Sequence, residues 1–155
     1  MNANESLINH FYTSFQNKDI KGMQNSYAGN ATFNDPAFRN LDAKQVRSMW
    51  EMLIKSSKDM RLEFGNIRAD SHSGSAEWTA YYTFSATGRK VVNRVKSSFI
   101  IENGKIVSQE DDFNFHRWSK QALGLSGLLL GWTSFLKKKV QKTASDKLKA
   151  YIATH

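Results

Sequence analysis

The spacing of the apolar residues changes once along this chain, and that change restricts the fold more than any other feature. Residues 4–17 and 42–56 place apolar side chains at helical intervals, and Asp42 stands where a helix N-cap is expected. From residue 60 to residue 115 the apolar residues alternate in four segments, which is typical of strands with one buried face. Glycine-containing turns join these segments at hairpin positions, so the strands are predicted to form an antiparallel meander. Helices followed by strands predict an α+β fold, with helices on one face of a curved sheet.

Two short elements are predicted before the second long helix. A helix is expected over residues 19–27, and a brief strand over residues 31–35 ends at Pro36, the only proline of the chain. Proline favours an extended conformation in the residue before it, here Asp35. One interpretation of Asp35 is a turn residue, because Asp and Pro both favour chain reversals. The other is a carboxylate that points into a pocket, where apolar surroundings would make it a base.

The composition predicts one globular domain without bound metal or cofactor. The chain has 155 residues, of which 40% are hydrophobic, and it has no cysteine, which excludes disulfides and thiolate chemistry. The four histidines show no metal-ligand spacing, and no nucleotide-binding motif is present. The chain does not begin like a secretory signal, and its longest apolar stretch has 11 residues, whereas a membrane span needs about 20. We therefore expect a cytoplasmic protein.

The positive charge lies almost wholly in residues 116–155. This segment holds 8 Lys and Arg against Asp146 alone, whereas residues 1–115 hold 14 Lys and Arg and 13 Asp and Glu. Residues 132–152 place apolar side chains on one helical stripe and lysines on the remainder. The favoured interpretation is a helix that packs on the rest of the domain or across a dimer, with its lysines in water. Contact with an anionic membrane is an alternative. Nucleic acid ranks last, because the lysines lack interleaved aromatic and arginine side chains.

The predicted order of elements resembles the nuclear transport factor 2-like superfamily, a cone-shaped α+β fold that includes ketosteroid isomerases and SnoaL-type polyketide cyclases. The resemblance covers residues 5–115 and is carried by YTSFQNKDIKGMQNSYAGNATFNDP at residues 12–36, with its Asp-Pro corner. DDFNFHRWSKQALG, at residues 111–124, resembles the tail of a bacterial SnoaL-like subgroup. The resemblance implies a cone domain over residues 1–115, a basic helical extension over residues 116–155 packed on it, and a homodimer.

A cone of this kind implies a pocket between the first helices and the inward face of the sheet. An aromatic lining there would fit a small, flat, apolar molecule that is polycyclic or bears a carbonyl group. The same rings could instead fill a core, as aromatic stripes commonly do. The residues expected at this lining are Phe11, Tyr12, Phe15, Tyr27, Phe33, Trp50, Trp78, Tyr82, Ser97, Phe99 and Phe113.

The resemblance also implies roles for two carboxylates. Asp35 matches the aspartate with which ketosteroid isomerases move a proton between carbons next to a carbonyl, and Asp111 resembles the acidic pocket residue of SnoaL-type cyclases. The oxyanion-hole positions fall on Phe11 and Ser97, so ketosteroid isomerase activity itself is not expected. Two functions stay open: ligand binding with Asp-based proton transfer, as in an isomerase, cyclase or hydrolase, and non-catalytic binding of a ligand or protein, with the basic tail on a membrane or partner.

Overall fold

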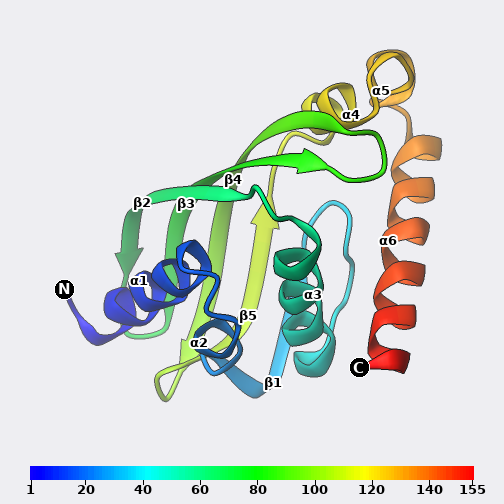
Figure 1. Cartoon of the computed structure of the whole chain (residues 1–155). Coiled ribbons are helices and arrows are strands. Elements are labelled where there is room, and N and C mark those ends of the chain that lie inside the picture. Colours follow the sequence, from blue (N-terminus) through cyan, green and yellow to red (C-terminus); the bar gives the residue numbers. More distant parts are fainter.

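The computed structural model describes residues 1–155 and places three helices on one face of a five-stranded sheet (Figure 1). These helices are α1 (Ala3–Gln16), α2 (Ile20–Gln24) and α3 (Ala43–Ser56). The strands are β1 (Tyr27–Asn34), β2 (Arg61–Ala69), β3 (Ser73–Phe84), β4 (Arg89–Glu102) and β5 (Lys105–Asp112). The chain ends in α4 (Phe115–Leu123), α5 (Leu125–Leu130) and α6 (Ser134–Thr154). The predicted α+β class with an extra C-terminal helix is confirmed.

The sheet has the strand order β1-β5-β4-β3-β2. Strands β2 to β5 form the predicted antiparallel meander, whereas β1 pairs with β5 in parallel. The β4–β5 turn uses Asn103 and Gly104, both at positive φ (51° and 73°), the conformation that suits a tight hairpin. The long β3–β4 hairpin bends away from the flat part of the sheet towards α6 (Figure 1).

Three predicted boundaries are corrected by the structure. Strand β1 begins at Tyr27, which pairs with Ile106 of β5, rather than at residue 31. The sequence pattern missed this start because the pairing shifts register after Tyr27 and the burial of the strand does not alternate cleanly. Strand β5 ends at Asp112 rather than residue 115, because the side chain of Asn114 accepts the Arg117 N–H and caps α4. Helix α2 is shorter than residues 19–27, since Asp19 is its N-cap and the helix stops at Gln24.

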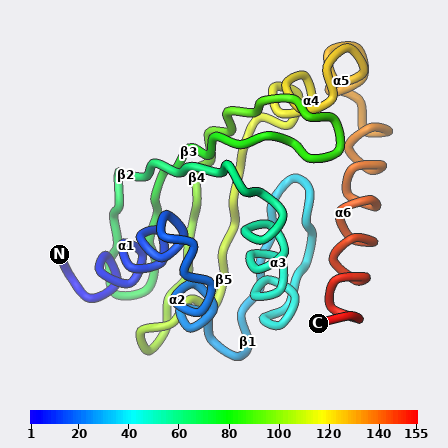
Figure 2. Tube along the Cα trace, viewed as in Figure 1, coloured from blue at the N-terminus to red at the C-terminus, as the bar shows by residue number.

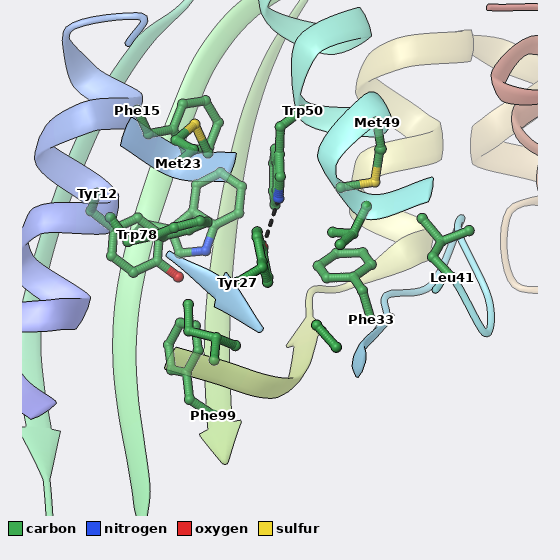
Figure 3. Packing of buried hydrophobic residues seen from close by; sticks show 14 of the residues in the cluster. Tyr12, Phe15, Met23, Tyr27, Phe33, Leu41, Met49, Trp50, Trp78 and Phe99 are labelled. Atoms are coloured by element: carbon green, nitrogen blue, oxygen red, sulfur yellow. Dashed lines mark hydrogen bonds between the residues drawn. The ribbon is translucent and has the colours of Figure 1, made fainter. Parts of the chain in front are cut away.

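The core lies between α1, α2, α3 and the sheet face that they cover, and it is dominated by aromatic rings (Figure 3). Phe11 is fully buried and meets four rings edge to face, with centroid distances from 5.0 to 6.4 Å. Edge-to-face contacts of this kind add to the hydrophobic effect of burial. These four rings belong to Tyr12, Tyr27, Trp50 and Phe99.

Helix α6 lies alongside α3 (Figure 2). Leu136 and Leu148 are buried, the Gln141 side-chain amide donates to the Pro36 carbonyl (3.0 Å), and Tyr151 donates its hydroxyl to Glu51 (2.7 Å). The helix therefore packs on the rest of the chain through its apolar stripe. Trp132, which the stripe included, is instead 74% exposed because it precedes the helix. None of the helices combines the length and apolar character needed to cross a bilayer.

Candidate active site

A cavity of about 700 Å³ lies between α3, the bent β3–β4 hairpin and the C-terminal helices. This volume is within the range of small-molecule sites, and most of the lining is hydrophobic. Helix α6 forms part of the wall with Leu136, Val140 and Ala144. Because this wall comes from residues beyond the cone domain expected over residues 1–115, the basic extension is part of the site.

The predicted lining residues divide into two groups. Phe15, Trp50, Trp78, Tyr82 and Phe113 line the cavity. The other six are at most 2% exposed and pack in the core, where Figure 3 shows several of them: Phe11, Tyr12, Tyr27, Phe33, Ser97 and Phe99. The inward aromatic residues thus both fill a core and face a cavity, and Phe15, Trp50 and Trp78 do both.

Asp111 lies on β5 at the inner end of the cavity, directly across from Ser97 in the β4–β5 register. Its Oδ1 accepts hydrogen bonds from the Ser97 hydroxyl (2.6 Å) and from the Gln109 side-chain amide (3.0 Å). Its Oδ2 is buried and has no partner in the protein. Burial raises the pKa of Asp111 to about 7, against the effect of these two donors. Because Oδ1 is already occupied by two donors, a proton bound to Asp111 resides on Oδ2.

Two chains of hydrogen bonds fix the Asp111 carboxyl group from the core. In the first, Ser97 accepts from the Tyr12 hydroxyl (2.7 Å) and from the Trp78 indole N–H (2.9 Å) while it donates to Asp111. Its hydroxyl therefore uses both acceptor positions and its single donor. Burial raises the pKa of Tyr12 well above its ordinary value, so Tyr12 remains a neutral donor.

The second chain reaches Asp111 through Gln109. The Trp50 indole N–H donates to the Tyr27 hydroxyl (2.8 Å; dashed in Figure 3), and Tyr27 donates to Gln109 Oε1. The Gln109 amide then donates to Asp111 Oδ1. Asp111 Oδ2 is the one buried side-chain oxygen of the two chains that has no partner, and both chains end on Asp111 Oδ1.

Asp35 occupies a turn and also lines the cavity. Its Oδ1 accepts the backbone N–H groups of Ala37 (2.7 Å) and Phe38 (2.6 Å), as in an Asx turn. Its Oδ2 makes no hydrogen bond, and burial raises the pKa of Asp35 to about 6. The charge of Asp35 also contributes to the raised pKa values of Asp111 and Tyr82, which places the three groups within electrostatic reach of one another.

Tyr82 adds a hydrogen-bond donor to the same cavity. Its hydroxyl oxygen accepts the Trp118 indole N–H (2.8 Å), while its own hydrogen has no acceptor in the protein. Burial raises the pKa of Tyr82, which keeps the hydroxyl protonated. Trp118 lies on α4 and was not among the predicted site residues, although it stands in the DDFNFHRWSKQALG segment. No group of three or more His, Asp or Glu side chains is placed to hold a metal ion.

Ser97→Ala is expected to destabilise the fold by about 2–3 kcal/mol, because two buried donors, Tyr12 and Trp78, lose their acceptor. Tyr12→Phe removes one of these donors and should cost less. In the double variant the loss should be smaller than the sum of the two single losses. Urea unfolding of the four proteins measures this coupling, and additive losses would show that Ser97 does not connect the two side chains energetically.

Comparison with known proteins supports this architecture. The family model described as the SnoaL-like domain matches residues 8–109. A search of functionally curated proteins found no match to the chain. A candidate polyketide cyclase from Pseudomonas putida aligns with a TM-score of 0.66 and 20% identity, over 79% of this chain and 98% of that chain.

Two further structures are similar to the same degree. An NTF2-like protein of unknown function from Burkholderia pseudomallei aligns with a TM-score of 0.63 and 19% identity, over 73% of this chain and 92% of that chain. An LEH-like epoxide hydrolase from M. tuberculosis aligns with a TM-score of 0.62 and 18% identity, over 83% of this chain and 96% of that chain. At these identities the likeness concerns the fold. The family match covers most of the chain, and the chain therefore belongs to the SnoaL-like domain family of the nuclear transport factor 2-like superfamily.

Proposed function

We propose that this protein binds a small, apolar, carbonyl-bearing molecule and moves a proton on it by acid-base catalysis, without a cofactor. One observation carries the proposal. Asp35 and Asp111 each have Oδ1 held by two donors and Oδ2 without a partner, and both residues line one largely apolar cavity. Two carboxyl groups whose pKa values are raised towards neutrality in one cavity are the arrangement that acid-base catalysis needs.

The surroundings of the two carboxyl groups favour different roles, because two backbone N–H groups stabilise the ionised form of Asp35, whereas the Asp111 side chain is buried. With a pKa of about 6, Asp35 is mostly ionised at neutral pH and is the base. With a pKa of about 7, Asp111 retains its proton in a large fraction of molecules and is the acid. Asp35 Oδ2 would take a proton from the carbon next to the carbonyl, and the C–H electron pair would form the C=C bond of an enolate. Asp111 Oδ2–H and the Tyr82 hydroxyl would donate hydrogen bonds to the enolate oxygen.

The lining indicates the class of substrate. Trp50, Trp78, Tyr82 and Phe113 present ring faces and edges, while Asp35 and Asp111 supply the acidic groups of the wall. Flat, polycyclic molecules with one or a few carbonyl oxygens match this combination. The SnoaL-like family assignment and the fold neighbours described as a candidate polyketide cyclase and an epoxide hydrolase support a catalytic use of such a cavity.

The test uses 2-tetralone, a bicyclic ketone whose hydrogens next to the carbonyl exchange with solvent. Proton NMR in D₂O measures the exchange rate, and quenching of tryptophan fluorescence measures binding. We expect the protein to bind 2-tetralone and to accelerate the exchange above the buffer rate. Binding without acceleration would contradict proton transfer and would favour the non-catalytic binding module.

Tyr82→Phe is expected to slow this exchange by about 10²-fold and to change binding little, because one of two donors to the enolate oxygen is removed. Tyr81→Phe is the matched control, since the Tyr81 hydroxyl lies 3.4 Å from Glu63 in an exposed position. The same NMR assay compares both variants. Equal rates for Tyr82→Phe and the wild type would remove Tyr82 from the mechanism.

A further inference from the structure

The segment from Leu125 to Phe135 exposes large apolar side chains to solvent. Six of them are between 44% and 74% exposed. Elsewhere in the chain, only Met1 and Ile100 are exposed large apolar residues. A contiguous exposed apolar cluster on a small protein commonly marks an interaction site. We name this cluster the α5 surface and define it as Leu125, Leu128, Leu129, Leu130, Trp132 and Phe135.

Close packing of α5 on α4 fixes this exposure. Gly127 is buried, and a Cβ atom at this position would lie 1.9 Å from the Ser119 carbonyl oxygen, so only glycine allows the approach. A Cβ atom at Gly131 would lie 2.9 Å from the side chains of Ser119 and His116 on α4. Because the glycine side of α5 faces α4, its leucines face solvent. Figure 1 shows α4 and α5 together at one corner of the molecule, beside the first turns of α6.

Positive charges flank the α5 surface along the chain. Lys137, Lys138 and Lys139 follow it on α6, and Arg117 and Lys120 precede it on α4, all of them exposed. No acidic residue stands between Asp112 and Asp146. An apolar centre with a cationic border is complementary to an anionic lipid surface, where the apolar side chains enter the acyl region and the lysines meet the headgroups.

We propose that the α5 surface docks this protein onto anionic membranes. A second copy of the chain is a poorer partner, because a symmetric contact would bring the lysines of the two borders together. Nucleic acid would leave the leucines uncovered. The apolar stripe of α6 cannot insert into lipid while Leu136 and Leu148 are buried against the domain. The contact therefore involves α5 and Trp132, not the face of α6 that the sequence suggested as a membrane alternative.

The α5 surface also borders the cavity. Leu123, Ser126 and Leu136, which are close to it in the sequence, line the cavity wall. Docking would place this rim at the lipid, so that an apolar ligand could pass between bilayer and cavity without crossing water. The docking itself does not depend on the proposed proton transfer, which is assayed with 2-tetralone in the absence of vesicles.

The experiment is co-sedimentation of the full chain with vesicles. We expect the protein to sediment with phosphatidylcholine vesicles that contain phosphatidylglycerol and not with pure phosphatidylcholine vesicles. Binding should weaken as the salt concentration rises, because the lysines act through screened electrostatics. Failure to sediment with the anionic vesicles would overturn the proposal, and equal binding to neutral vesicles would contradict the role of charge.

Apolar variants test the surface itself. Leu129→Ser combined with Trp132→Ser should weaken vesicle binding by about tenfold or more, since both side chains are exposed in the free protein and would be buried in lipid. Ile100→Ser is the matched control, being exposed on β4 outside the α5 surface. A dimer in sedimentation velocity that Leu129→Ser and Trp132→Ser abolish would identify a second copy as the occupant and overturn the lipid proposal.

Charge variants test the basic border separately. Lys137→Glu with Lys138→Glu should weaken binding to the anionic vesicles by about tenfold or more. Lys21→Glu with Lys44→Glu changes the net charge equally but lies on α2 and at the start of α3, at the opposite end of the molecule (Figure 1). Equal loss in the two pairs would show that overall charge, and not this surface, controls binding, and would overturn the proposal.

Discussion

Asp111→Asn is expected to make the protein more stable than the wild type above about pH 7, and to remove much of the dependence of its stability on pH. The buried carboxyl group titrates at about 7 in the folded protein, against an ordinary value of 3.8. This difference in pKa corresponds to about 4 kcal/mol of free energy. At high pH, the ionised Asp111 side chain destabilises the folded state relative to the unfolded chain by this amount. Asparagine keeps a carbonyl oxygen for Ser97 and Gln109 and carries no charge.

The sign follows from which state holds the proton. Between pH 3.8 and about 7 the folded protein keeps a proton on Asp111 that the unfolded chain has released. The contribution of Asp111 to the free energy of unfolding is therefore largest below pH 3.8. It falls as the pH rises from 3.8 to about 7 and is constant above that. Asp35, with a pKa raised to about 6, contributes in the same direction over a narrower window.

Urea unfolding measured from about pH 4 to about pH 8 provides the test. The wild type should lose stability over this range, whereas Asp111→Asn should retain only the smaller slope due to Asp35. Asp112→Asn is the matched control, because Asp112 is exposed on the same strand and should leave the slope unchanged. A variant at position 111 that is less stable than the wild type at pH 8 would contradict the proposed energetics of the site.

Local patterns were sufficient to predict most of this fold. Alternation predicted β2 to β5 and their hairpins, and helical spacing with a cap at Asp42 predicted α3, where the Asp42 and Gln45 side chains form a capping box. The start of β1 could not be predicted in this way, because its first residues pair irregularly with a strand about 80 residues later. Parallel pairing between distant segments leaves no local signature.

The site was less predictable than the fold. Asp35 and Asp111 were identified through a family resemblance, and the structure places both on one cavity. Alternation predicted the same inward face for Phe99 and Phe113 and could not separate them. Phe99 lies on β4 in the core, whereas Phe113 follows the end of β5 and lines the cavity. Trp118 enters the site only because α4 folds back onto the β3–β4 hairpin, which no spacing in the sequence encodes.

In the proposed mechanism, Asp111 would supply the acid although the oxyanion-hole positions implied by the resemblance are changed. Ser97 replaces the expected carboxylic acid on β4, and Asp111 lies directly across from it on β5 and accepts its hydrogen bond. The acid is therefore displaced by one strand within the same cone. Phe11 lacks a hydroxyl, and the free donor comes instead from Tyr82 on β3. This rearrangement favours a reaction geometry different from that of the ketosteroid isomerases.

Asp35→Asn is expected to reduce the exchange of 2-tetralone by about 10²–10⁴-fold, because the proposed base is lost, while binding should stay within about twofold. The asparagine carbonyl can still accept the N–H groups of Ala37 and Phe38, so the turn and the cavity wall should be preserved. For the wild type, kcat/KM should rise through a pH of about 6 as Asp35 ionises and fall through about 7 as Asp111 loses its proton.

Asp111→Asn separates the two limbs of this profile. The variant should lose the fall near pH 7 and keep the rise near pH 6, because only Asp35 still titrates in the cavity. Undiminished exchange in Asp35→Asn would exclude this residue as the base. If kcat/KM of Asp35→Asn still rises near pH 6, the rise is due to the ionisation of another group. Both carboxyl variants should bind 2-tetralone like the wild type, and only Asp35→Asn should lose the rise of kcat/KM near pH 6. That result would identify Asp35 as the base through its own titration, in addition to the loss of activity.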